Sequence, residues 1–343
     1  MTQNNQLQNF AVLSPYKFLE EVEHSAAHAK QRVWMQAMYV DEGLIFSRIQ
    51  SMLRESVQRH IDTRLHADWF CLKFISGKRV TETSQAFLKK KALFEQLQQA
   101  GVSFTLTNLP NLVERVFPYK GRNHMKITII DEVAYLGGVN FADSDFEFAD
   151  FMVRFTDSKI VEAIAKLYTS IETRTVQNES VVINHQTKLL IDRGSIGHSV
   201  ILNHAVKLAR SSKESIDYTC QFFPDGPLLS SLHRCFQKKQ SIRTICPPHN
   251  AFSQMFIIVF AFNRWSIKLR RKNIPIYILN KPVHAKLLIV DKSAALFGSH
   301  NLTRSGVIMG TGEVALQSTN PELVANLQAY FDRLMQSTQP LAR

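Results

Sequence analysis

The chain has 343 residues, of which 45% are apolar, and its 41 lysines and arginines outnumber its 29 acids to give a formal charge of +12. This composition excludes a disordered chain, and the length is too great for one small core, so it predicts two domains or one large duplicated unit. The positive charge favours an anionic partner, either nucleic acid or an anionic membrane surface, over a generic basic surface.

The sequence also narrows the expected location of the protein. Its first residues lack a basic stretch followed by an apolar one, so we expect no signal peptide. The longest apolar run, Met255–Phe262, is far shorter than the ~20 residues that a membrane-spanning helix needs. The cysteines show no paired spacing, which predicts a reduced compartment: Cys71, Cys220, Cys235 and Cys246. We expect a cytoplasmic protein, at most peripheral at the inner membrane face, without a transmembrane helix.

Taken in chain order, the predicted elements occur twice. The stretch "AHAKQRVWMQAMYVDEGLIFSRI" near Ala27 and the stretch "KLARSSKESIDYTCQFFPDGPLLSSL" near Lys207 both indicate a helix end, an apolar strand, a turn with Asp and Gly, and a new amphipathic helix. The stretches "QRHIDTRLHADWF" and "KKQSIRTICPP" then both predict a helix end, a basic turn and a short strand. Each half continues into a strand hairpin, at Asn123–Phe141 and at Val283–Thr303.

Each hairpin is followed by the last helix of its half, expected at Ser158–Glu172 and at Pro321–Gln336. The alternation of strands and helices predicts an α/β fold in which helices cover a mixed sheet in each half. The polar, weakly periodic segment Thr173–Gln186 is the expected linker. It divides the chain into an N-terminal half at 1–175 and a C-terminal half at 187–343.

The two hairpins carry the same polar pattern, H-x-K-x4-D followed by G-[GS]-x-N. The first copy contains His124, Lys126, Asp131, Gly137, Gly138 and Asn140, and the second contains His284, Lys286, Asp291, Gly298, Ser299 and Asn301. With this composition, one chance match to H-x-K-x4-D is expected roughly 0.03 times in the chain. Two copies at equivalent points of a repeat are therefore not coincidental.

The residue types in these motifs suit a phosphodiester. Residues i and i+2 of a strand face the same side, so each His and Lys project together, and the returning strand brings the Asn beside them. Two lysines and two asparagines would hold the non-bridging oxygens and the charge that grows on them in the transition state. One imidazole would attack phosphorus while the other exchanges protons with the leaving and entering oxygens. This chemistry requires no metal and no cofactor.

The acids in and near the motifs are expected to have two different roles. Asp131 and Asp291 stand at strand ends before turns, so we interpret them as structural hydrogen-bond acceptors. A working imidazole needs a partner that orients its other nitrogen. Asp150 and Glu313, each a similar distance beyond the His of its own half, are the candidates, with solvated strand-edge acids as the alternative.

These motifs resemble the signature of the phospholipase D superfamily, and the resemblance covers the chain from about Phe10 to Met335. It implies two α/β halves that meet at a pseudo-twofold axis around one shared active site. It further implies that His124 is the nucleophile, which forms a phosphohistidine, and that His284 is the general acid and base. The residues implied to bind the substrate phosphate are Lys126, Lys286, Asn140, Asn301 and Ser299.

The first motif departs from the second in two ways. Five residues separate Asp131 from Gly137, whereas six separate Asp291 from Gly298, and a shorter turn can change strand register. Gly138 also replaces the Ser of the second motif, although members of the cardiolipin synthase branch often have Gly-Gly there.

The substrate is the less constrained part of the prediction. "RNHMKITIIDEVAYLGGVNFAD" looks like the first motif of bacterial cardiolipin synthases, whereas "GSHNLTRSG", through Thr303, is closer to the nuclease-like members. The apolar and basic segment 253–279 would suit a helix on an anionic bilayer, a core helix or a nucleic-acid contact. We predict a metal-independent phosphodiesterase or phosphatidyltransferase of cardiolipin synthase type, peripheral at an anionic membrane surface. The alternatives are a nucleic-acid phosphodiesterase and, if the short hairpin displaces His124, an inactive anion-binding scaffold.

Overall fold

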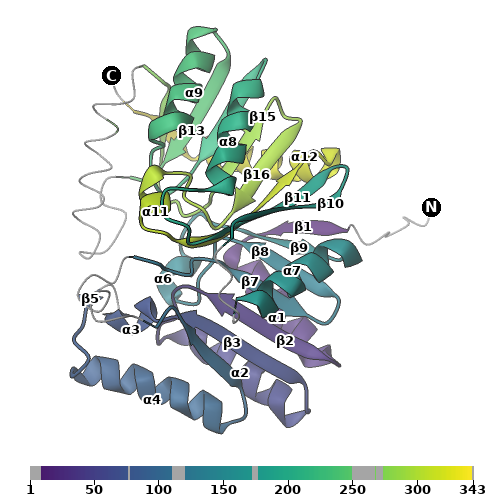
Figure 1. Ribbon diagram of the computed structural model, residues 1–343, viewed down its shortest axis with the longest axis vertical. Coiled ribbons are helices and arrows are strands. Elements are labelled where there is room, and N and C mark those ends of the chain that lie inside the picture. Colours follow the sequence, from purple (N-terminus) through teal and green to yellow (C-terminus); the bar gives the residue numbers. More distant parts are fainter. Residues whose placement is uncertain are drawn as a thin grey trace.

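The structure is a computed structural model and describes residues 9–75, 78–109, 120–171, 177–248, 267 and 273–341. The first half of the chain, purple to teal in Figure 1, forms one layered α/β unit, and the second half, green to yellow, forms another against it. Each unit has its own mixed sheet. This arrangement confirms the predicted α/β fold with two mixed-sheet halves.

The first sheet has seven strands in the order β1-β9-β8-β7-β2-β3-β6. Its parallel strands are β2, β3 and β6, and the other neighbours pair antiparallel. In chain order the elements of this half are β1 Phe10–Leu13, α1 Pro15–His28, β2 Arg32–Ala37, α2 Leu44–Gln58, β3 Asp62–Asp68, α3 Phe70–Lys73, the small pair β4 Phe74–Ile75 and β5 Lys78–Arg79, α4 Gln85–Gln99, β6 Ser103–Thr107, β7 Ile127–Ile130, β8 Val133–Gly137, α6 Asp143–Phe146, β9 Met152–Phe155 and α7 Ser158–Ser170.

The second sheet has nine strands in the order β10-β11-β17-β16-β15-β12-β13-β14-β18. Its elements are β10 Glu179–Asn184, β11 Thr187–Arg193, α8 Val200–Ser211, β12 Ser215–Thr219, α9 Gly226–Gln237, β13 Ser241–Cys246, β14 Ile276–Leu279, β15 Leu287–Val290, β16 Ala294–Gly298, α11 Arg304–Ile308, β17 Gly312–Ser318, α12 Pro321–Gln336 and β18 Thr338–Pro340. Without β10 and β18 at its edges, this order repeats that of the first sheet strand for strand. The repeat found in the sequence is thus a repeat of topology.

The shorter turn of the first hairpin leaves the strand register unchanged. In β7 and β8, Ile127 pairs with Leu136, the residue before Gly137. In β15 and β16, Leu287 pairs with Phe297, the residue before Gly298. The difference in length is confined to the turn, so both Gly-x-x-Asn segments follow their hairpins at equivalent positions. The register shift that the shorter turn allowed does not occur.

One buried cluster joins the two halves. It combines apolar side chains of β7, β8 and β9 with those of β15, β16 and β17, and it includes the apolar faces of α7 and α12. Phe151 illustrates the contact between halves, because its ring packs against Phe297 at 6.0 Å and against Tyr330 at 4.8 Å between ring centroids. Both helices begin at side-chain caps, Asp157 for α7 and Asn320 for α12. The shared cluster places the ends of both hairpins at the junction of the halves.

Two sequence-based expectations need correction or fall outside the structure. Glu179–Asn184, expected within the linker, is strand β10 and pairs with β11, because its consecutive residues Val181, Val182 and Ile183 are β-branched and favour a strand. Residues 173–176 of the expected linker lie outside the described residues. Of the segment 253–279, for which a helix was one interpretation, residues 253–266 and 268–272 lie outside the described residues, and Ile276–Leu279 is strand β14. Within the described ranges, no helix has the length and apolar character needed to cross a membrane. All four cysteines are free and buried.

Candidate active site

The two motif histidines lie where the two halves meet. The backbone N–H of His124 donates to the carbonyl of Gly312 in the second half at 2.8 Å. The backbone N–H of His284 donates to the carbonyl of Ala149 in the first half at 3.0 Å. Each histidine precedes its β-hairpin and is held by the strand-entry segment of the opposite half. The two motifs therefore converge on one site, as the duplicated sequence predicts.

Each imidazole pairs with a carboxylate, and the pairs cross between the halves. Nδ1 of His124 donates to Glu313, whose two carboxylate oxygens both lie 3.0 Å away. Nδ1 of His284 donates to Asp150 at 2.6 Å. The sequence named Asp150 and Glu313 as candidates without stating which histidine each would serve. Each contacts the histidine of the opposite half, because β9 and β17 begin beside the opposite motif. With the proton on Nδ1, the lone pair of each ring is on Nε2.

The two motif lysines are buried cations at the same junction. Nζ of Lys126 donates to the carbonyl of His124 at 2.7 Å, and Nζ of Lys286 donates to the carbonyl of His284. Burial and the facing Lys286 lower the pKa of Lys126 to about 7, and burial also lowers the pKa of Lys286. Two ammonium groups that are costly to bury together form a site for an anion, which would offset their repulsion.

The same surroundings keep the imidazoles neutral. Burial, together with Lys126, lowers the pKa of His124 to about 4, although Glu313 opposes the shift. Burial and the two lysines also lower the pKa of His284 well below its usual value. At neutral pH both rings therefore carry a free lone pair on Nε2, which a nucleophile or a general base requires.

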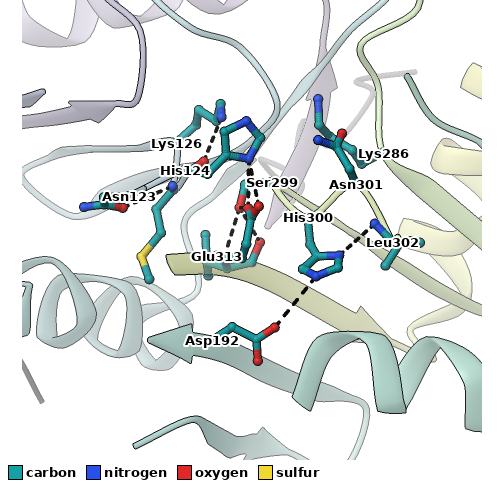
Figure 2. Close-up of polar contacts among 12 residues, drawn as sticks. Asn123, His124, Lys126, Asp192, Lys286, Ser299, His300, Asn301, Leu302 and Glu313 are labelled. Atoms are coloured by element: carbon teal, nitrogen blue, oxygen red, sulfur yellow. Dashed lines mark hydrogen bonds and ion pairs between the residues drawn. The ribbon is translucent and has the colours of Figure 1, made fainter. Parts of the chain in front are cut away.

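The motif asparagines lie at the site but differ in their partners. Asn140 is buried, its Nδ2 donates to Asp145 at 2.7 Å, and its Oδ1 accepts from the backbone N–H of Tyr39 at 3.2 Å. Asn301 lies with Lys286 in Figure 2, and its backbone carbonyl accepts from the thiol of Cys220 at 3.2 Å. The predicted role of both amides in binding a substrate phosphate stays a prediction.

Ser299 differs from its predicted role. Its side chain is fully buried, its hydroxyl donates to Glu313, and its oxygen accepts from the backbone N–H of Val314 at 3.0 Å. A hydroxyl has one proton to donate, so this contact leaves none for a substrate phosphate. The Ser of the second motif orients the carboxylate that orients His124.

Gly138, at the matching position of the first motif, has a steric explanation. A Cβ atom there would lie 2.3 Å from a carboxylate oxygen of Asp150, closer than any side chain tolerates. The carboxylate of Asp150 thus occupies the space that a serine side chain would fill. The replacement of Ser by Gly in this motif is part of how the first half holds its acid.

Asp131 and Asp291 tie down the far ends of the hairpins. The carboxylate of Asp131 accepts from the backbone N–H groups of residues 30–32 at 2.8–3.0 Å. That of Asp291 accepts from the backbone N–H groups of residues 213–215 at 2.8–2.9 Å. Burial opposes the shift, but these donors lower the pKa of both acids. Both are structural acceptors at the opposite strand end from the histidines.

Three further polar residues at the site have little signal in the sequence. Asp145, the partner of Asn140, is buried, and burial raises its pKa to about 6. Its signal was an acid among the apolar residues of "FADSDF". His300 and Asp192 are both buried and lie near Glu313. The first motif has Val139 at the position of His300. Among the described residues, no group of three or more His, Cys, Asp or Glu side chains could hold a metal ion.

The chain is similar to several known proteins. The family model "Cardiolipin synthase, PLD-like domain" matches residues 206–335. The minor cardiolipin synthase ClsB of Bacillus subtilis is 21% identical over 339 residues, covering 94% of this chain and 80% of that protein. The cardiolipin synthase of Alkalihalophilus pseudofirmus is 25% identical over 236 residues, covering 62% of this chain and 46% of that protein. The structure of phosphatidylserine synthase from Haemophilus influenzae superposes with a TM-score of 0.73 at 14% identity, covering 97% of this chain and 87% of that one.

Proposed function

Because the chain is a cardiolipin synthase-like protein of the phospholipase D superfamily, we propose that it transfers a phosphatidyl group between alcohols through a covalent intermediate on His124. The observation that carries this proposal is the pair of crossed histidine–carboxylate contacts around two buried lysines. The lipid substrate is inferred from what the similar proteins are named for.

The first half-reaction uses both imidazoles. Lys126 and Lys286 bind the non-bridging oxygens of the phosphodiester, which lowers the cost of the charge that grows there. Nε2 of His124 forms a bond to phosphorus as the bond from phosphorus to the leaving oxygen breaks. That oxygen takes a proton from Nε2 of His284. The bound anion offsets the positive charge of the two lysines and so favours the protonated form of His284 before this step. Glu313 stabilises the positive charge on the phosphorylated ring of His124.

The second half-reaction reverses these transfers with a new alcohol. The alcohol proton passes to Nε2 of His284 while the alcohol oxygen bonds to phosphorus, and the bond from phosphorus to His124 breaks. The pKa values of the two acids suit a nucleophilic role for His124 and a proton-transfer role for His284. Although burial opposes it, His124 and His300 hold the pKa of Glu313 well below its usual value, so it stays charged. Burial raises the pKa of Asp150 to about 6, where protons exchange readily.

The proposed setting is a peripheral one at an anionic membrane surface, which the formal charge of +12 supports. The cytoplasmic location stays a prediction. The inactive-scaffold alternative depended on a displaced first hairpin, and the equivalent registers of β7 with β8 and of β15 with β16 count against it.

The test uses purified protein in EDTA with vesicles of phosphatidylglycerol, and in parallel with single-stranded and double-stranded DNA. The expected products are cardiolipin and glycerol, with no DNA cleavage and with an acid-labile phosphoenzyme that His124→Ala cannot form. DNA cleavage without lipid turnover would instead assign a nucleic-acid phosphodiesterase. Loss of turnover in EDTA that Mg²⁺ restores would contradict a metal-independent reaction.

A further inference from the structure

A second buried imidazole lies next to the proposed nucleophile's acid. His300 stands between Ser299 and Asn301 in the second motif and is 3% exposed. One of its ring nitrogens faces Leu302 and the other faces Asp192, as Figure 2 shows. The first motif has Val139 at this position. This imidazole therefore belongs to the second half alone.

The contact with Leu302 defines which nitrogen of His300 carries the proton. The backbone N–H of Leu302 donates to Nδ1 at 2.7 Å, and a nitrogen that accepts cannot carry a proton. Nε2 is therefore the ring nitrogen that carries a proton. Leu302 has a φ of +51°, a left-handed conformation that is uncommon for leucine. The hydrogen bond thus helps to fix an unfavourable turn directly after Asn301.

Nε2 of His300 faces Asp192, whose cross-strand partner is Glu313. Asp192 on β11 and Glu313 on β17 are cross-strand partners, so their side chains share one face of the sheet. Two negative charges in such positions repel each other. The Nε2 of His300 is 3.9 Å from Asp192, and Asp192 is itself held by the hydroxyl of Ser199 and, at 2.7 Å, by the backbone N–H of Val200.

We propose that His300 is a positioning residue of the reaction: its Nδ1 fixes the Asn301–Leu302 turn, and its Nε2–H allows Asp192 and Glu313 to stay charged together. Glu313 then keeps its charge beneath His124, where Lys126 also acts on it. Asp150, the acid of the other pair, has no such support, since Val139 is apolar.

The two functions of His300 separate by substitution. In His300→Asn, the side-chain oxygen replaces Nδ1 as the acceptor for Leu302, but no proton faces the acids. His300→Val, which copies the first motif, loses both contacts. Asp192→Asn removes the competing charge. His204→Asn is the matched control, because His204 also contacts β17, through Gln317 at 2.8 Å, away from Glu313.

The readout that needs no substrate is the pKa of the His124 ring, followed by NMR of protein labelled with ¹⁵N-histidine and identified by its loss in His124→Asn. Without the Nε2–H of His300, the charges of Asp192 and Glu313 repel each other more strongly. A proton on the His124–Glu313 pair reduces this repulsion, so the pair binds that proton more tightly. His300→Asn should therefore raise this pKa by about half a unit or more, and adding Asp192→Asn should reverse the rise. His204→Asn should leave it unchanged.

The kinetic readout, which rests on the proposed function, is the acidic limb of kcat with bis(p-nitrophenyl) phosphate. The limb should move to higher pH in His300→Asn by the same amount and return in the double variant. A folded His300→Asn protein with an unchanged His124 pKa overturns the inference, and so does a rise that Asp192→Asn does not reverse. A shifted pKa in a protein that cleaves no diester supports the inference and counts against the proposed activity.

Discussion

The His124–Glu313 pair and the His284–Asp150 pair occupy equivalent positions in the two halves, but their surroundings differ. Glu313 accepts from Ser299 and lies beside His300, whereas Asp150 fills the space left by Gly138 and lies beside Val139. Both acids accept two hydrogen bonds, Glu313 from His124 and Ser299 and Asp150 from His284 and the backbone N–H of Phe151. Nearby His and Lys side chains nevertheless lower the pKa of Glu313 against the effect of burial, whereas burial raises that of Asp150. In a duplicated site, two equivalent histidines can therefore have different roles because the neighbours of their acids differ.

The largest expected effect separates the two histidines. With bis(p-nitrophenyl) phosphate, whose leaving group needs no proton, His284→Asn should still form the phosphoenzyme, whereas His124→Asn should form none. Both should lose turnover of phosphatidylglycerol by roughly 10³-fold or more. Phosphoenzyme is measured by acid quench and mass spectrometry. A phosphoenzyme on His284 in the wild-type protein would reverse the assignment.

Substitutions of the two acids should also affect the two reaction steps differently, with smaller losses of rate than the histidine substitutions cause. Glu313→Gln should slow phosphoenzyme formation by roughly 10²–10³-fold, because the ring of His124 loses the charge that stabilises its imidazolium. Asp150→Asn should slow the attack of the second alcohol more than the first step. Single-turnover kinetics measure the two steps separately. Equal effects of both substitutions on both steps would mean that the halves do not divide the roles.

The residues that hold these acids should matter in different ways. Gly138→Ala places a methyl group against Asp150 and should lower turnover about as much as Asp150→Asn, with little further loss when the two are combined. Ser299→Ala removes one hydrogen bond to Glu313 and should cost about tenfold. The measurement is kcat for each single and double variant. Additive losses for Gly138→Ala and Asp150→Asn would show that the methyl group acts elsewhere.

The smallest effect on chemistry is expected at the turn acids. Asp131→Asn and Asp291→Asn should each lower the free energy of unfolding by about 1–3 kcal/mol, because charged acceptors of three backbone N–H groups are lost. Their lowered pKa values mean that this stability is present above the unfolded pKa and is lost as pH falls through the folded value. Chemical unfolding measures both changes, while kcat per folded molecule should stay close to wild type.

Much of this protein follows from local sequence. The period-2 pattern of the hairpins, the helices that follow them and the repeated H-x-K-x4-D motif predict the duplicated α/β fold and six of the site residues, because strand faces and helix stripes are set by near neighbours. The prediction of α12 at Pro321–Gln336 matches the observed bounds because a Pro at the first position and an Asn cap mark its start.

The pairing of acids with histidines was decided only by the tertiary structure. Asp150 lies 134 residues before His284, and Glu313 lies 189 residues after His124, so no local pattern states which acid reaches which ring. Ser299, Gly138 and His300 lie next to acids of their own half that stand on other strands, so their contacts also depend on the tertiary structure. Sequence periodicity determines which face a residue occupies, whereas the packing of two halves against each other determines what that face meets.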